Sequence, residues 1–299
     1  MSDGPVFIGG LAFSGKTPLR VALSAHPRLM LTRRSALWSR HHERYGHLGS
    51  PANLDRCLTA LLADPDVARL KPDRARIERE LRAGPATEAR LFDLIHRHHA
   101  ERHGKQRWGD QMGMLERHAD LVLTAYPTAQ MIHMIRDPRT RHAAAASAHR
   151  QLPGRLGWET ARWRESADLA ERNLSRYPGR YRVLRYESLC SAPETTLRAV
   201  TAFLGEAFDP AMLSALDAVT LDDHRRRVAF DAQREATVSG FIQRHVATQM
   251  LAHGYPLTAG VRDAGPRLPW SLVNRLCDSA GIALWHSVRA PQPAWKGVR

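Results

Sequence analysis

Short apolar runs and amphipathic stretches follow each other along the chain. After the first run, Leu19, Ala22 and Leu23 recur at the spacing that gives a helix one apolar face. Strands that alternate with helices predict a mainly parallel, helix-covered sheet. The runs with the length of buried strands are residues 5–8, 28–32, 129–135 and 181–185.

A long helical region separates the second run from the third. From Ser35 to His103 apolar residues keep a helical spacing, with Leu58 and Leu61 in one element and Leu91 and Leu94 in another. We expect one α/β domain over residues 1–258, with a substrate-facing helical insert at about 35–125.

We expect residues 259–299 to form a C-terminal appendage. Its amphipathic stretch from Trp270 to Trp285 is framed by prolines. A helix packed on the body is the favoured interpretation. A homodimer contact and a surface anchor are the alternatives.

Composition narrows the class of protein. The 299 residues are 43% hydrophobic and 25% charged, which is ordinary for a globular chain. We find no run of about 20 apolar residues for a membrane helix and no leader pattern at the N-terminus, so a soluble, cytoplasmic protein is expected. Cys57, Cys190 and Cys277 are odd in number and far apart, which favours a reducing compartment over a disulfide framework or a CxxC metal site.

The net charge of +14, from 44 basic and 30 acidic residues, favours anionic partners in general. Almost all the basic residues are arginine, which together with the abundant alanine is typical of genome composition as much as of selection for a polyanion. No RNA-binding aromatic motif, zinc finger or helix-turn-helix pattern is evident. We therefore expect no specific nucleic-acid partner.

The chemistry is carried by a glycine-rich loop. Residues 10–17, GLAFSGKT, satisfy GxxxxGK[ST] between a buried strand and a helix N-terminus. There, successive backbone N–H groups and the helix dipole bind an anion, and Lys16 can reach the bond that breaks. This context favours a phosphate site over a plain connecting turn, and it predicts a P-loop NTPase-like three-layer fold.

Two reaction classes use such a loop. NTP-dependent phosphoryl transfer needs Mg²⁺, held by Thr17 and by an acid that ends a second buried strand, where Asp137 stands. Arg136 precedes that acid. An arginine is unusual for a metal site and natural for a phosphate site, because its planar guanidinium donates two parallel hydrogen bonds.

From about Val6 to about Pro256 the chain resembles the PAPS-dependent sulfotransferases. Three segments carry the resemblance. FIGGLAFSGKTPLRVALSAHP is similar to the 5′-phosphosulfate loop, MIHMIRDPR to the 3′-phosphate segment, and YRVLRYESL with PETTLRAVTAFLGEAFDPAM to the downstream block. They stand at residues 7–27, 131–139, 181–189 and 193–212.

The resemblance implies PAPS as donor, PAP as product and no metal. It implies that Ser14 to Thr17 wrap the 5′-phosphosulfate, that Arg136 pairs with the 3′-phosphate and that Tyr186 lies near the adenine. The family's serine two turns after the arginine is displaced here to Ser147. The expected cofactor-binding residues are Ser14, Gly15, Lys16, Thr17, Pro18, Arg136, Ser147 and Tyr186.

The general base of the family has no direct counterpart. Arginines stand at 33 and 34 where a glutamate is expected, and the central motif reads Trp108-Gly-Asp110-Gln-Met-Gly. Asp110 is the first candidate, with a helix cap as its alternative role. His41 is the second, beside His42 and Glu43.

Arg33, Arg34 and Trp38 are the candidate acceptor-binding residues. The arginines suit an anionic acceptor, and exposed loop arginines are the alternative. Their sequence does not name the acceptor.

The function expected is transfer of a sulfuryl group from PAPS to a hydroxyl or amine of a small-molecule, glycan or lipid acceptor. Lys16 would neutralise charge on the departing phosphate oxygen. The alternatives are an NTP-dependent P-loop kinase and a nucleotide-binding protein without catalysis.

Overall fold

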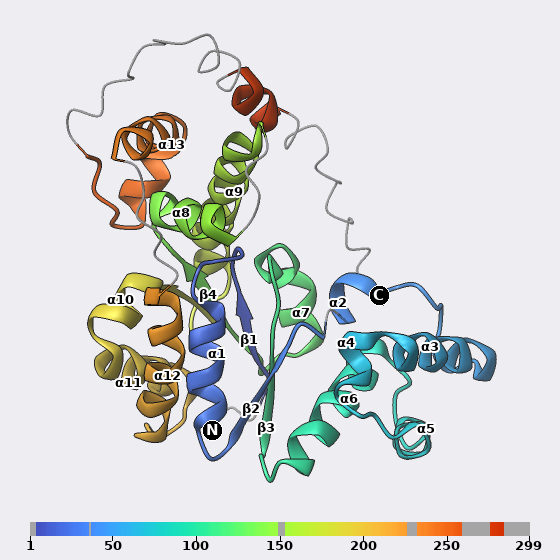
Figure 1. Cartoon of the computed structure of the whole chain (residues 1–299). Coiled ribbons are helices and arrows are strands. Elements are labelled where there is room, and N and C mark those ends of the chain that lie inside the picture. Colours follow the sequence, from blue (N-terminus) through green and yellow to red (C-terminus); the bar gives the residue numbers. More distant parts are fainter. Residues whose placement is uncertain (1–3, 36, 149–152, 226–231, 259–275, 284–299) are drawn as a thin grey trace.

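The chain is built on one sheet in which all the described strands run parallel (Figure 1). A computed structural model describes residues 4–35, 37–148, 153–225, 232–258 and 276–283. The strand order is β2-β3-β1-β4-β5. The strands are β1 Val6–Gly9, β2 Leu29–Arg33, β3 Arg107–Gln111, β4 Gln130–Ile135 and β5 Tyr181–Arg185.

Helices cover both faces of the sheet. Successive side chains of β1 therefore pack into different hydrophobic clusters. Phe7 packs with Trp108 and Tyr126 in a cluster shared with the insert. Val6 and Ile8 pack in a second cluster on the other face. The helices of that second face are α1 Lys16–Ala25, α10 Tyr186–Ser191, α11 Pro193–Leu204 and α12 Ala211–Arg225. The predicted three-layer α/β fold is confirmed.

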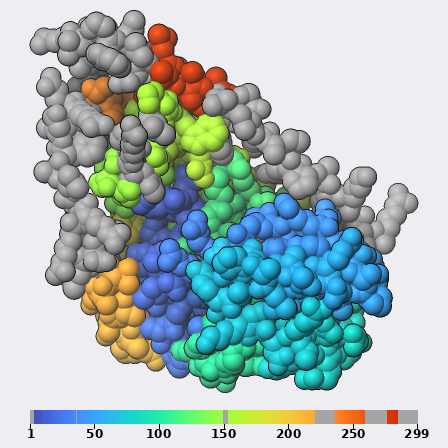
Figure 2. Space-filling view, turned by 45° about the vertical axis from the view of Figure 1, so that its right-hand side comes forward, coloured from blue at the N-terminus to red at the C-terminus, as the bar shows by residue number. Residues whose placement is uncertain are grey.

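The insert follows β2 and packs as one body beside the N-terminal segment (Figure 2). Its apolar positions form the predicted helical stripes, and Leu58, Leu61, Leu91 and Leu94 are all buried. The insert helices are α2 Leu37–Arg40, α3 Pro51–Ala63, α4 Pro65–Ala68, α5 Arg74–Arg82 and α6 Glu88–Arg102. A short 3₁₀ turn η1 Leu115–His118 and α7 Ala119–Ala125 return the chain to the sheet.

The stretch assigned to the insert, 35–125, also contains β3, which sequence reasoning did not identify. This strand lies between β2 and β1 and is buried along its whole length. Its sequence, RWGDQ, carries three polar side chains, so no apolar run marks it. Polar groups buried in a strand usually need partners, and the side chains of Arg107 and Asp110 have them.

Arg107 is the clearest of these partnered residues. Its side chain is 1% exposed and donates to the backbone oxygens of Gly4 at 2.6 Å and Leu204 at 2.7 Å. It also donates to Gln130 Oε1 at 2.8 Å and pairs with the buried Glu206 at 3.1 Å. One guanidinium therefore joins the N-terminal segment, β3, β4 and the end of α11.

A third cluster lies beyond the carboxyl ends of the central strands (Figure 1). Its helices are α8 Pro138–Ala148, α9 Arg155–Arg176 and α13 Ala232–Ala252. Trp163 and Ile242 are fully buried at its centre.

Part of the C-terminal appendage packs on this cluster. Residues 276–283 are helical, and Ile282 joins the core of the third cluster. The Gly157 N–H donates to Asp278 Oδ1 at 3.2 Å, and a Cβ at Gly157 would lie 1.6 Å from the Asp278 oxygen. The favoured interpretation, a helix packed on the body, holds for these eight residues. The rest of the predicted 270–285 stretch lies outside the described residues.

Within the described residues, none of the helices combines the length and the apolar character that crossing a membrane requires.

Replacing Arg107 tests the buried arginine. We expect Arg107→Met to lower the free energy of unfolding by about 3–5 kcal/mol, because Glu206 then stays buried without its charge partner. Equilibrium urea unfolding measures the change. Arg82→Ala is the matched control: this exposed arginine pairs with Glu78 on its own helix, and its loss should cost less than about 0.5 kcal/mol. If the two variants lowered the free energy of unfolding equally, the role of Arg107 as a buried link between elements would be contradicted.

Candidate functional site

The glycine-rich loop of residues 10–17 joins β1 to α1 as predicted. Gly10 has φ 113°, and a Cβ there would lie 2.2 Å from the Met134 oxygen. Gly15 caps α1 with φ 88°, and its missing Cβ leaves room for the Tyr186 ring, which would otherwise lie 2.1 Å away. Only glycine fits either position without strain. The loop therefore places free amides at the N-terminus of α1, the geometry of an anion site.

Lys16 is folded back over its own loop. Its Nζ donates to the Gly10 oxygen at 2.7 Å and to the Leu11 oxygen, and the residue is 7% exposed. Ser14 supports the same turn, because its hydroxyl donates to the Leu11 oxygen at 2.6 Å. The loop carbonyls thus hold the lysine ammonium.

The pKa of Lys16 is lowered to about 7. Burial is the main cause, and it is reinforced by repulsion from Arg141, Arg162 and Arg34, while attraction to Glu116 opposes it. A lysine with this pKa loses half of its charge near neutral pH. A bound anion would restore the charge.

Two arginines at the start of α8 flank the loop. Arg136 Nη1 donates to the Phe13 oxygen at 3.2 Å, and its Cζ lies 4.5 Å from the centre of the Tyr186 ring. Arg141 Nη1 donates to the Ala12 oxygen at 3.3 Å, and this residue is 5% exposed. The Tyr186 ring therefore touches both Arg136 and the Gly15 backbone, where the resemblance puts the adenine.

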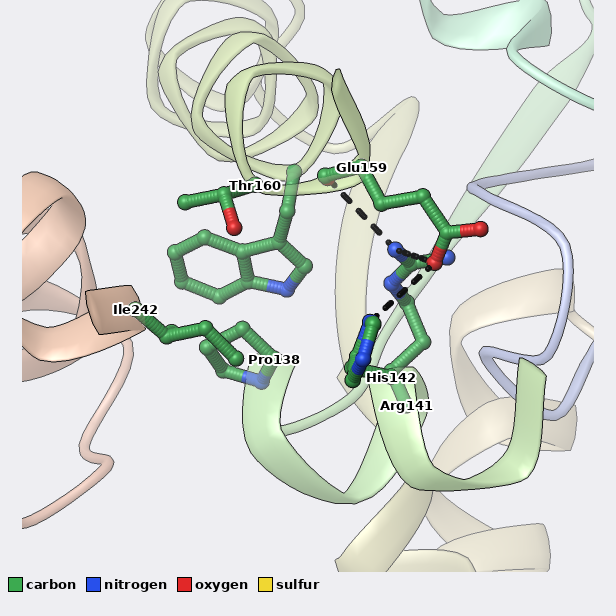
Figure 3. Close-up of a pocket in the computed structure, with 7 residues that line it drawn as sticks. Pro138, Arg141, His142, Glu159, Thr160 and Ile242 are labelled. Carbon is green, nitrogen blue, oxygen red and sulfur yellow. Dashed lines mark hydrogen bonds and ion pairs between the residues drawn. The ribbon is translucent and has the colours of Figure 1, made fainter. Parts of the chain in front are cut away.

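Figure 3 shows how Arg141 is held. Glu159 Oε2 accepts from Arg141 Nη2 at 3.0 Å. Glu159 Oε1 also accepts from Arg155 at 2.9 Å. Burial raises the pKa of Glu159, but His142, Arg141 and Arg155 outweigh it and lower the pKa to about 2. The surrounding walls, including Trp163, leave no room for a ligand. Glu159 therefore holds Arg141 in place through this ion pair.

Further positive charge comes from α9 and from the end of β2. Arg162 Nη2 lies 3.1 Å from the Sδ atom of Met114, whose own N–H donates to the Gly10 oxygen at 3.1 Å. Arg34 has φ 55°, a left-handed conformation held by its N–H bond to the Gln111 oxygen at 2.9 Å. Both act electrostatically on Lys16. The loop is thus surrounded by basic groups from three different elements.

Asp110 ends near the same edge of the sheet, since it pairs in register with Phe7 and Thr32. It is 6% exposed and accepts from Thr32 Oγ1 at 2.7 Å and from Ser35 Oγ at 2.6 Å. Burial raises its pKa to about 6, although the hydrogen bonds from Ser35 and Thr32 oppose the shift. The carboxylate both clips the chain after β2 and titrates close to neutral pH.

His41 lies in the insert with both ring nitrogens engaged. Nδ1 is 2.8 Å from the phenol oxygen Oη of Tyr45, and Nε2 is 3.0 Å from Asp64 Oδ2. His42 pairs with Glu88 at 2.6 Å. These contacts tie the two histidines to insert helices, and none of them reaches the loop.

The remaining predicted cofactor-binding residues lie in α1 and α8. Thr17 is exposed and Pro18 is buried in the first turn of α1. Ser147 is exposed and donates to the Ala143 oxygen of its own helix at 3.0 Å. The surroundings of Arg33 and Trp38 differ from those of Arg34.

The candidate acceptor residues have different neighbours. Arg33 is exposed and repels Arg20 of α1, whereas Arg34 acts on Lys16. Trp38 is 7% exposed, and its ring packs edge-on against Phe92 in the insert core.

Asp137, the acid that a kinase would use for magnesium, is otherwise engaged. Both of its oxygens accept from the Arg139 guanidinium, at 2.6 Å for the shortest bond. Its own N–H donates to Glu187 Oε1 at 2.9 Å. The carboxylate is therefore neutralised by the arginine that follows it.

Sequence reasoning missed Glu116, Arg141 and Arg162. Glu116 is completely buried and accepts from the Gly10 N–H at 2.7 Å. Arg141 stands in the same segment as Arg136, so a search for a second arginine after the RDPR motif could have found it. Glu116 and Arg162 carry no such signal, because their distance from the loop in sequence hides their place in the fold.

The chain matches a protein family over more than half of its length. Residues 5–210 match the family described as Sulfotransferase family. No curated protein matches the chain at a significant level.

Several solved structures are similar at low identity. The sulfotransferase domain of the Synechococcus PCC 7002 olefin synthase is 21% identical, with 96% of this chain and 95% of that one covered and a TM-score of 0.45. A Mycobacterium avium sulfotransferase is 15% identical, with coverages of 86% and 78% and a TM-score of 0.48. Retinol dehydratase, solved with androsterone and the inactive cofactor PAP, is 13% identical, with coverages of 90% and 84% and a TM-score of 0.40.

The family match includes the loop, β3, the RDPR segment and most of the downstream block, more than half of the chain. It unites the features that the geometry singles out, and the chain belongs to the sulfotransferase family.

Proposed function

We propose that this sulfotransferase binds PAPS at the loop of residues 10–17, with Lys16, Arg136 and Arg141 as its main charged contacts. The observation that carries the proposal is the Arg141 guanidinium. It is buried beside the loop, and its Nε has no hydrogen-bond partner among the described residues. A buried donor of this kind suits an anionic ligand that completes its hydrogen bonds.

Sulfuryl transfer needs positioning and charge neutralisation more than covalent help from the protein. PAPS supplies a sulfuryl group; the acceptor oxygen bonds to sulfur as the sulfur–oxygen bond to the 5′-phosphate breaks, and PAP leaves with that electron pair. Lys16 must release the Gly10 and Leu11 oxygens to donate to the departing phosphate oxygen. The loop amides stabilise the rest of the charge.

The 3′-phosphate is assigned to Arg136 and Arg141. Ser147, the first hydroxyl after Arg136, is exposed and bonded within α8, so it is a weaker candidate for this contact. Arg141 offers a buried, charged donor from the same helix. Tyr186 is assigned to the adenine, since its ring already stacks against Arg136.

Asp110 is the proposed general base. It accepts the proton of the acceptor hydroxyl, and a pKa of about 6 leaves it largely ionised at neutral pH. His41 is less suited to this role, because Tyr45 and Asp64 occupy both of its nitrogens.

The acceptor is a small molecule, and we propose that it carries an anionic group beside its hydroxyl or amine. Arg34 supports this assignment, since it is exposed next to Lys16 in a strained backbone conformation, a feature that concentrates at functional sites. Arg33 would contribute from the neighbouring position, and Trp38 would shape the wall from within the core.

The proposed setting is the cytoplasm. Cys57 is a buried free thiol and Cys190 an exposed one, which suits a reducing compartment. We propose a homodimer through the appendage, supported by Leu276, a large apolar residue that is 64% exposed. We propose no specific nucleic-acid partner.

Calorimetric titration with PAP, ADP and ATP, each with and without Mg²⁺, tests the donor assignment. We expect PAP to bind with an affinity that Mg²⁺ does not change, because arginines rather than carboxylates face the nucleotide phosphates. Binding of ATP that requires Mg²⁺, without binding of PAP, would favour the kinase alternative and overturn the proposal.

The pH dependence of turnover tests Asp110. We expect the rate to fall as pH drops below about 6, because a protonated carboxyl cannot accept the acceptor's proton. Asp110→Asn should lower kcat by about 10²-fold or more. Release of PAP measures the rate, with an acceptor chosen from a screen of alcohols and phenols.

Ser35→Ala is the matched variant for this test. The Ser35 hydroxyl lowers the pKa of Asp110, so its removal should move the acidic limb of the profile to higher pH. An unchanged acidic limb in this variant would leave Asp110 with its structural role alone.

A further inference from the structure

We propose that Glu116 is a positioning residue for sulfuryl transfer: it fixes the Gly10 peptide of the donor loop and serves as the buried counter-charge of Lys16. This inference rests on the proposed function of the loop. Glu116 lies in η1, more than a hundred residues from Gly10 in sequence, and its side chain is completely buried.

The first observation is that side chains hold the backbone of Gly10 on both sides of its Cα. The Gly10 N–H donates to Glu116 Oε2 at 2.7 Å, and the Gly10 oxygen accepts from Lys16 Nζ at 2.7 Å. Glu116 therefore holds the Gly9–Gly10 peptide group, and Lys16 donates to the Gly10–Leu11 peptide group that follows it. A shift of Glu116 would move the carbonyl that sets the position of the Lys16 ammonium.

The second observation is a chain of hydrogen bonds that ends on Glu116. Ser166 Oγ donates to Glu116 Oε1 at 2.6 Å, so its oxygen is free to accept from His133 Nε2 at 2.9 Å. His133 Nδ1 then accepts from the Tyr181 hydroxyl at 2.8 Å. Every proton in this chain points towards the carboxylate. The hydrogen bonds of this network together stabilise one negative charge in the core.

The charge states agree with this direction. Burial alone would raise the pKa of Glu116, but the hydrogen bonds from Ser166 and the Gly10 N–H help to hold it below its usual range. Burial lowers the pKa of His133, which fits a neutral ring that donates from Nε2. Glu116 is therefore an anion at neutral pH, in a place where an unsupported carboxylate would take up a proton.

The Glu116 carboxylate favours the charged form of Lys16. Groups from three other elements face it, and all three are repulsive: Arg34 after β2, Arg141 in α8 and Arg162 in α9. Glu116 is the group whose charge opposes the loss of the lysine proton. Without Glu116, Lys16 would be neutral over more of the pH range in which it must face the leaving phosphate.

Binding of PAP as a function of pH tests the proposal without any acceptor. For wild type we expect constant affinity below about pH 7 and a fall above it, because the unbound Lys16 is then neutral and binding must take up a proton. In Glu116→Gln the fall should begin about one pH unit lower, since the attractive charge is gone. Calorimetry from pH 5.5 to 9 measures both profiles.

Two further variants separate charge from scaffolding. Glu116→Asp keeps the charge but shortens the reach to Gly10, so the pH midpoint should stay near 7 while affinity falls about tenfold at every pH. Ser166→Ala disturbs the same network and leaves the carboxylate in place, so its midpoint should also stay near 7. Thermal unfolding of each variant reports whether it folds.

The outcomes distinguish the inference from the function on which it rests. If wild type does not bind PAP, the donor site itself is wrong. If wild type binds PAP but Glu116→Gln and Ser166→Ala show the same midpoint, Glu116 has only a structural role. If Glu116→Gln fails to fold, a Glu116→Asp midpoint well below 7 would overturn the proposal by itself.

Discussion

The backbone of Gly10 is the point on which the proposed site depends. Gly10 follows β1 directly, its missing side chain lets the loop pass against the Met134 oxygen, Glu116 accepts from its N–H, and Lys16 donates to its oxygen. The parallel sheet makes this possible, because the central strand delivers the loop between β3 and β4. The position of the lysine charge is thus set by the core of the protein rather than by the loop alone.

Around Gly10 the protein gathers positive charge from several elements. Burial lowers the pKa of Lys16, repulsion from Arg34, Arg141 and Arg162 adds to the shift, and the ammonium donates to the Gly10 oxygen. Glu159 accepts from Arg141, and Glu116 accepts from the Gly10 N–H. An anion relieves such repulsion between cations, which favours the phosphorylated nucleotide of the proposed function.

The sequence predicted the parts of the site that are local in the chain. The loop, its helix and the Arg136 segment follow from contiguous motifs, and the sheet follows from apolar runs. It could not predict β3, whose buried Arg107 and Asp110 depend on partners far away in sequence. Glu116 and Arg162 were missed for the same reason, since only the fold brings them to Gly10 and Met114.

A crystal structure of the chain with PAP would test the central claim most directly. The account predicts that Lys16 Nζ leaves the Gly10 and Leu11 oxygens and lies within hydrogen-bond distance of the 5′-phosphate, with Arg136 and Arg141 at the 3′-phosphate. PAP bound away from the loop, or a Lys16 that keeps its carbonyl contacts beside bound PAP, would contradict it.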